Sequence, residues 1–95
     1  MKILDKLGMC MAYKGYLYWE DAITIAKRTK KNELPMQKIY EKIAKKYETT
    51  TNSVERGMRR SMNQIINLNQ KTNTDYVFTN KKLLAWIVRK DKGDE

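Results

Sequence analysis

The sequence predicts an all-α fold, a small single domain of about five helices. Apolar residues recur at intervals of three and four in five separate segments, and no alternating, strand-like pattern extends beyond three residues. The chain has 95 residues, of which 41% are apolar and one is proline, so it can bury one modest core and is too apolar to be disordered. We therefore expect residues 1–95 to form one domain.

The first two helices follow from apolar spacing near the N-terminus. Ile3, Leu4 and Leu7 recur at helical spacing, and Gly8 directly afterwards is a typical helix stop. After a short connector, a second amphipathic helix is predicted over residues 16–28, since its aromatic and aliphatic side chains fall on one stripe.

The third helix follows a polar loop over residues 29–35. Pro35 ends that loop and suits the first position of a helix, where its missing N–H costs nothing. The apolar stripe that marks the helix comprises Ile39, Tyr40, Ile43, Ala44 and Tyr47.

The fourth helix begins after a run of turn and capping residues. Either Thr50 or Asn52 can cap it, and Asn52 has Glu55 three residues later, which is the spacing of a capping box. We expect this helix to run to about Leu68.

The last third of the chain predicts a polar loop and one more helix. Residues 69–75 are polar, and residues 76–78 form a short apolar patch that is either extended or docked on the core. Thr79 or Asn80 then caps a final helix with Leu83 and Leu84 on its apolar face.

A helical wheel for residues 54–68, at about 100° per residue, separates two faces of the fourth helix. One face is apolar and is expected to be buried; the other carries arginines and amides, and Glu55 flanks it. The apolar face holds Val54, Met58, Met62, Ile65 and Leu68, with Ile66 at its edge. The outward face holds Arg56, Arg59, Arg60, Asn63 and Asn67.

The spacing between the third and fourth helices predicts a helix-turn-helix over residues 37–68. A small residue in the first helix lets the second helix cross closely, and Ala44 lies ten residues before the apolar Val54. The turn position that usually holds glycine is Glu48. A positive φ there would cost about 1 kcal/mol, which favours a different turn conformation.

The charge of the chain is concentrated in its middle third. The formal net charge is +9, and residues 27–60 hold eleven basic and four acidic residues, or +7. Such a basic patch favours a polyanion or an anionic membrane surface as partner, while a generic solubilising surface is the plain alternative.

The residue inventory disfavours an enzyme. The chain has no histidine, no phosphate-cradling glycine loop and no metal-spaced carboxylate cluster, so we expect no catalytic activity, no metal and no cofactor. The single Cys10 excludes an internal disulfide and is expected to be a small buried residue. The longest apolar run, Leu83 to Val88, is too short to span a bilayer, and a cytoplasmic location is expected.

Two segments, "KGYLYWEDAI" and "IYEKIAKKYETTTNSVERGMRR", resemble a known family. It is the C-terminal DNA-binding effector domain of the master sporulation response regulator of endospore-forming bacteria. The resemblance runs from about Ile3 to Val88. It implies that the helix beginning near Asn52 enters the major groove, with Glu55 and Arg56 as base contacts. Arg59 matches a family arginine near DNA.

The resemblance has three departures from the family pattern. Arg60 stands where the family has histidine. No phosphoacceptor receiver domain is found in the chain, and residues 69–78 are about one helix shorter than in the family. In the family that region is implicated in contacting the RNA polymerase sigma subunit. We therefore expect binding to double-stranded DNA, head-to-tail pairing on tandem sites and weak activation of transcription.

These observations assign a role to each candidate residue. Arginine can read guanine, asparagine adenine, and glutamate can accept from cytosine. The expected base contacts are Glu55, Arg56 and Arg59; base or phosphate contacts are Asn52, Ser53, Arg60 and Asn63; phosphate contacts are Lys45, Lys46 and Thr50. Two alternatives stay open: an interaction module acting on RNA polymerase or on a full-length sporulation regulator, and a basic domain that binds RNA or a membrane surface.

Overall fold

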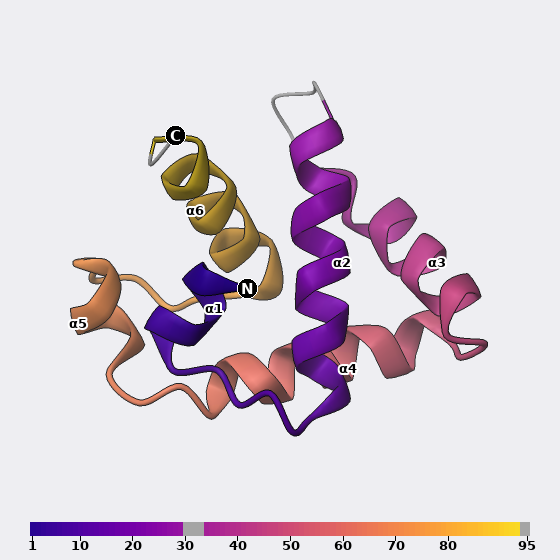
Figure 1. Cartoon of the computed structure of the whole chain (residues 1–95), viewed down its shortest axis with the longest axis horizontal. Helices are drawn as coiled ribbons and strands as arrows, with labels where there is room; N and C mark the ends of the chain where they lie inside the picture. Colours follow the sequence, from indigo (N-terminus) through magenta and orange to yellow (C-terminus); the bar gives the residue numbers. More distant parts are fainter. Residues whose placement is uncertain (30–33, 94–95) are drawn as a thin grey trace.

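The computed structural model describes residues 1–29 and 34–93, with six helices and no strand among them (Figure 1). The expectation of an all-α fold is confirmed. The helices are α1 (Lys2–Leu7), α2 (Lys14–Arg28), α3 (Met36–Lys46), α4 (Thr51–Asn63), α5 (Leu68–Thr72) and α6 (Asn80–Gly93).

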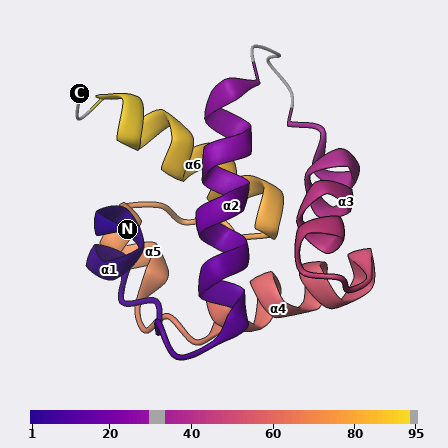
Figure 2. The same ribbon diagram turned by 45° about the vertical axis from the view of Figure 1, so that its right-hand side comes forward.

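The central element of the fold is α2, which packs against α3, α4 and α6. Figures 1 and 2 show it upright, with α3 and α6 on either side and α4 crossing its N-terminal end. Its side chains Trp19, Ala22 and Ile23 are completely buried. Because α2 contacts three helices at once, the single modest core expected from the composition is assembled around it.

The first helix ends as its sequence predicts. Gly8 has a φ of 86°, in the left-handed region that glycine adopts without strain, and its N–H donates to the carbonyl of Asp5. Lys71 of α5 donates from Nζ to the carbonyl of Leu7 at 3.0 Å. This contact joins the C-terminal end of α1 to α5, and the two helices lie side by side in Figures 1 and 2.

Two expected starts of helices are also found. Pro35 directly precedes α3, as its position after the polar loop predicts, although residues 30–33 of that loop lie outside the described residues. At the start of α6, Thr79 Oγ1 accepts a hydrogen bond from the N–H of Lys82 at 3.2 Å, so Thr79, and not Asn80, caps this helix.

The fourth helix is shorter than expected, because it ends at Asn63 and not near Leu68. The N–H of Ile65 turns back to the carbonyl of Met62, and Ile65 is buried although it lies outside the helix. Asn67 has a φ of 58°, which breaks any helical continuation. Asn67 therefore does not belong to the outward face of α4, Leu68 belongs to α5, and Ile66 is exposed.

The segment after α4 also departs from the expected polar loop. Residues 68–72 form the short helix α5, and Asn73 with a φ of 56° ends it. Phe78 is half-buried and packs against the core, so it is docked, while Val77 is 83% exposed. Tyr76 is exposed and packs on the ring of Phe78, with 4.9 Å between the ring centroids.

The expectation of a buried Cys10 is wrong, because its side chain is exposed. It lies in the connector between α1 and α2, where Met9 is buried and Met11 is exposed. The neighbouring Met9 thus takes the core position that was expected for the cysteine.

Candidate nucleic-acid interface

The turn between α3 and α4 adopts the conformation that the glutamate was expected to disfavour. Glu48 has a φ of 53°, and the N–H of Thr49 donates to the carbonyl of Ala44 at 2.9 Å. The expectation that a glutamate at this position would give the turn a different conformation is therefore wrong. The turn accepts roughly 1 kcal/mol of strain because both helices are fixed by their packing.

The packing between α3 and α4 follows the predicted ten-residue spacing. Ala44 is 5% exposed and Val54 is completely buried, and the two helices are in direct contact. Ile43 and Met58 are also buried. The small side chain on α3 lets α4 cross closely, so α3 and α4 form a packed pair of helices joined by a short turn, as a helix-turn-helix requires.

The N-terminus of α4 is capped by Thr50 and not by Asn52. Thr50 Oγ1 accepts from the N–H of Ser53 at 3.1 Å, while Asn52 is exposed inside the first turn. The capping box expected between Asn52 and Glu55 is therefore absent. The Glu55 carboxylate instead pairs with Arg59 Nη1 at 3.3 Å, one turn further along the helix.

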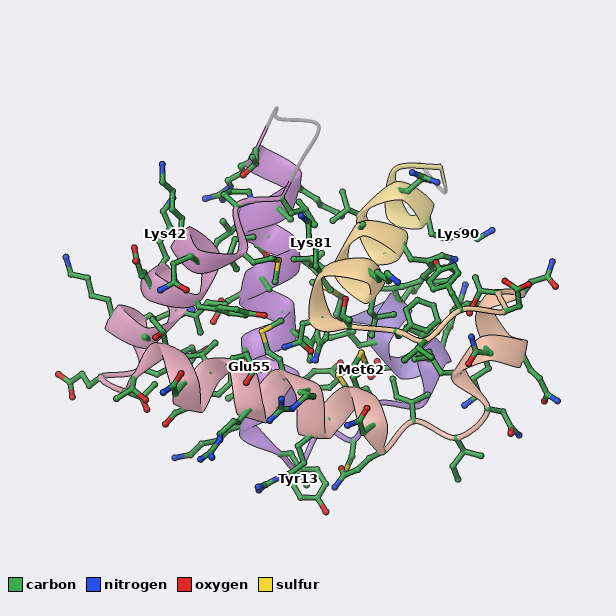
Figure 3. The ribbon with its side chains drawn as sticks, turned by 180° about the vertical axis from the view of Figure 1, so that it is seen from behind. Tyr13, Lys42, Glu55, Met62, Lys81 and Lys90 are labelled. Atoms are coloured by element: carbon green, nitrogen blue, oxygen red, sulfur yellow. The ribbon has the colours of Figure 1, made fainter. Side chains whose placement is uncertain are left out.

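The outward face of α4 carries the predicted cations. Arg56, Arg59, Arg60 and Asn63 are all exposed and, with Gln64, line one shallow hollow. Figure 3 shows α4 from the side, with its axis lying across the view and with Glu55 and Met62 labelled on it. The opposite face is buried through Val54, Met58 and Met62, so the division into two faces is confirmed for the helical part of the wheel.

The two candidate lysines at the end of α3 differ in their surroundings. Lys45 is exposed, whereas Lys46 Nζ lies 2.9 Å from Asp21 Oδ1 of α2. The hydrogen bond and charge of Asp21 raise the pKa of Lys46. Asp21 also accepts a hydrogen bond of 2.5 Å from the hydroxyl of Tyr47, whose pKa is raised by burial first and then by that bond. Lys46 is therefore ion-paired, not freely available.

A close crossing of α2 over α4 positions the outward face, and sequence reasoning missed it. A Cβ added to Gly15 would collide with Ser61 Oγ and with the carbonyl oxygen of Gly57. Next to this crossing, the Trp19 indole donates from Nε1 to the carbonyl of Met58 at 2.9 Å in a buried hydrogen bond. Glycine at position 15 is therefore required for the approach of the two backbones.

Asn80 holds α4 from its other side, where sequence reasoning saw only a possible cap. Its Nδ2 donates to the carbonyl of Glu55 at 3.1 Å and to the hydroxyl of Tyr40 at 3.2 Å, and Asn80 is 6% exposed. Burial, above all, raises the pKa of Tyr40. One side chain at the start of α6 thus links α3 and α4 directly behind the outward face.

The described ranges, 1–29 and 34–93, contain no group of three or more cysteine or acidic residues arranged to hold a metal ion. No helix within these ranges is long and apolar enough to cross a membrane. The chemistry that the described surface offers at α4 is therefore that of exposed guanidinium, amide and hydroxyl groups, which suit phosphates and base edges.

A comparison with known protein families identifies the family of the chain. Residues 1–90 match the family described as "Sporulation initiation factor Spo0A C terminal", whereas no solved structure matches the chain. This family is the DNA-binding effector domain of a transcription factor and not a family of enzymes. The match covers nearly the whole chain, including α3 and α4. The chain belongs to the Spo0A C-terminal family of DNA-binding, transcription-regulating effector domains.

Proposed function

We propose that this domain, residues 1–95, is a sequence-specific regulator that inserts α4 into the major groove of double-stranded DNA. The observation that supports the proposal is the exposed row of arginines on the second helix of the helix-turn-helix. The major groove admits one α-helix, and a second helix crossing behind it presents its outer face to the base edges.

Arg56 is the proposed main base reader. It is exposed on the outward face and makes no ion pair among the described residues, so its planar guanidinium is free to contact guanine O6 and N7 together. Glu55 is its discriminating neighbour, since a carboxylate can accept from the amino group of cytosine. Arg59 must share or release Glu55 before it can contact a base, because the two form an ion pair in the free protein.

The remaining candidate residues lie around Glu55 and Arg56, on α4 and at the end of α3. Ser53 and Thr50 stand at the N-terminus of α4, where the positive end of the helix dipole favours a phosphate. Asn52, Arg60 and Asn63 are exposed along the same helix as base or phosphate contacts. The cations proposed to contact phosphates at the end of α3 are Lys45 and, after exchange of its Asp21 partner, Lys46.

Two further expectations from the family stay part of the proposal. The chain pairs head-to-tail on tandem sites, and its effect on transcription comes from occupancy more than from activation through the polymerase sigma subunit. The exposed Tyr76, packed on Phe78, is the residue through which an activating contact would act. A transcription assay in which Tyr76→Ala abolishes strong activation, with DNA affinity unchanged, would contradict the occupancy model.

Selection of random duplexes against the purified protein tests the proposal, followed by binding measurements on the selected site. Arg56→Ala is expected to cost about 1–3 kcal/mol on that site and to flatten the preference at one base pair. Lys45→Ala is the matched control, because a lost phosphate contact weakens all duplexes alike. Equal and sequence-blind losses from both changes would contradict the role of Arg56. Tighter binding to RNA or to anionic vesicles than to any duplex would overturn the proposed function.

A further inference from the structure

A second hollow lies on the flank of α4 that faces α2, and its polar lining is entirely cationic or hydroxylic. The cations are Lys14 from the first turn of α2 and Arg56 and Arg60 from α4. The lining residues that carry hydroxyl groups are Tyr18 of α2, Thr49 in the turn and Ser53 at the start of α4. Lys14 belongs to none of the contacts that the sequence or the family resemblance assigns.

The three cations of this hollow have no anionic partner in the free protein. Within residues 1–29 and 34–93, Lys14, Arg56 and Arg60 make neither an ion pair nor a side-chain hydrogen bond, and no carboxylate lines the hollow. The neighbouring cations differ, since Arg59 pairs with Glu55 and Lys46 pairs with Asp21. Three unpaired like charges around one depression repel each other, and an anion placed between them removes that repulsion.

The backbone brings these groups together by the close crossing already described. Gly15 lies against Gly57, which leaves Lys14, the preceding residue, beside the arginines of α4. The hydroxyl of Ser53 accepts a hydrogen bond of 2.9 Å from Thr50 Oγ1, so its own proton remains available for a further acceptor. The hollow thus offers charge from both helices and a hydroxyl donor at the N-terminus of α4, a combination suited to phosphate oxygens.

We propose that this hollow binds one phosphate of the DNA backbone that borders the major groove, with Lys14 and Arg60 as its charged contacts. The inference rests on the proposed function and adds a contact from α2, outside the helix-turn-helix. Arg56 and Arg60 both line this hollow and the outward one. The proposal assigns Arg60 to the DNA backbone and leaves Arg56 as the base reader. A contact from α2 fixes the rotation of α4 in the groove, because it holds one DNA strand at a second point.

The test compares Lys14→Ala with Lys90→Ala, a change of an exposed lysine on α6 that lies away from α4 in Figure 3. Lys14→Ala is expected to weaken the selected and an unrelated duplex by the same factor and to reduce the salt slope of log affinity by about 0.9. The affinity lost between about 50 mM and about 200 mM salt then becomes about threefold smaller than in the wild type. Lys90→Ala leaves the slope unchanged, and Lys14→Arg retains it. Thermal melting checks that each variant is folded.

A scan with single neutral methylphosphonates along each strand locates the phosphate. At one position the substitution is expected to weaken binding by the wild type, and to weaken binding by Lys14→Ala and by Arg60→Ala clearly less, because each variant keeps only one of the two charged contacts. If no position behaves in this way, or if Lys14→Ala and Lys90→Ala bind alike, the inference is overturned while duplex selection and Arg56→Ala still support the proposed function. A wild type that selects no duplex overturns both. Inorganic phosphate added at constant ionic strength is expected to compete weakly and only when Lys14 is present.

Discussion

The two flanks of α4 hold the same helix in different ways. On the α2 flank, two backbones touch at Gly15 and Gly57, and the surrounding cations are unpaired among the described residues. On the α6 flank, a side chain holds α4 in place, because Asn80 Nδ2 donates a hydrogen bond to the carbonyl of Glu55. On that side, Arg59 is already paired with Glu55.

The difference indicates that α4 is held by backbone packing on one flank and by polar contacts on the other. A backbone crossing without intervening side chains fixes the distance between two helices and leaves their flanking cations free for a ligand. A hydrogen-bonding side chain fixes the helix by its polar groups, and the ion pair beside it lowers the local positive charge. We therefore expect changes on the α2 flank to act through packing and DNA phosphates, and changes on the α6 flank to act through hydrogen bonding.

The largest expected effect comes from breaking the backbone crossing. Gly15→Ala places a methyl group against the Gly57 carbonyl and Ser61, and overpacking of this kind should cost about 3 kcal/mol. Gly57→Ala is the matched control, since its Cβ would meet the Tyr18 ring at 3.0 Å and the Gly15 Cα only at an ordinary contact distance of 3.9 Å, and alanine favours a helix by about 1 kcal/mol. Its free energy of unfolding should stay within about 1 kcal/mol of the wild type. Urea denaturation of both variants checks this, and equal losses would refute the crossing as the fixed point.

The next effect concerns the hydrogen-bonding flank. Asn80→Ala removes the bonds to Glu55 and Tyr40 and is expected to lower the free energy of unfolding by about 1–3 kcal/mol. Asn69→Ala removes a bond of 2.8 Å to the carbonyl of Tyr76, but in an exposed segment, so a loss below about 1 kcal/mol is expected. If urea denaturation ranks the two variants in the opposite order, Asn80 does not anchor α4.

A smaller effect distinguishes the paired from the unpaired arginine. Arg59→Ala breaks an ion pair between residues four apart on a helix, and about 0.3–0.5 kcal/mol of stability should be lost at low salt. Arg60→Ala has no such partner and should leave stability unchanged while weakening DNA binding. Thermal melts at low and high salt measure the contrast, which should vanish at high salt. If Arg60→Ala lost more stability than Arg59→Ala, the distinction between a paired and an unpaired flank of α4 would be wrong.

The smallest effect is expected in alkaline solution. Burial raises the pKa of Tyr40 above its ordinary value of about 10, so above that pH the unfolded chain loses the phenolic proton before the folded chain does. Stability therefore falls as the pH rises from about 10 through the folded-state pKa. Tyr40→Phe should make this decline shallower in urea denaturation measured between pH 9 and 11. If the free energy of unfolding of Tyr40→Phe fell with pH as steeply as that of the wild type, Tyr40 would not contribute to the pH dependence of stability.

Local signals in the sequence account for most of the helices and for part of the site. Gly8 ends α1 because its own backbone allows a positive φ, and Thr50 caps α4 because its hydroxyl reaches an N–H three residues on. The exposed arginines follow from the period of the helix alone. Each of these features depends on residues close in the chain, and each is therefore visible in the sequence.

The features that the sequence concealed depend on contacts between distant residues. Gly15 and Gly57 meet only because two helices cross, and no local pattern distinguishes them from other glycines. The end of α4 was misplaced because Ile65 is buried whether the chain continues as a helix or turns, so the apolar period cannot separate the two cases. Glu48 shows the reverse case, where packing on both sides overrides an unfavourable local conformation.

Cys10 has a practical consequence, because it is the only thiol of the chain and it is exposed four residues before Lys14. A maleimide dye attached there would label the protein at one defined position without a background substitution. Energy transfer from that dye to fluorophores at either end of a short duplex would report the orientation in which α2 faces the DNA. The same thiol, oxidised in storage, would join two chains covalently, so reducing agent belongs in every measurement of pairing in solution.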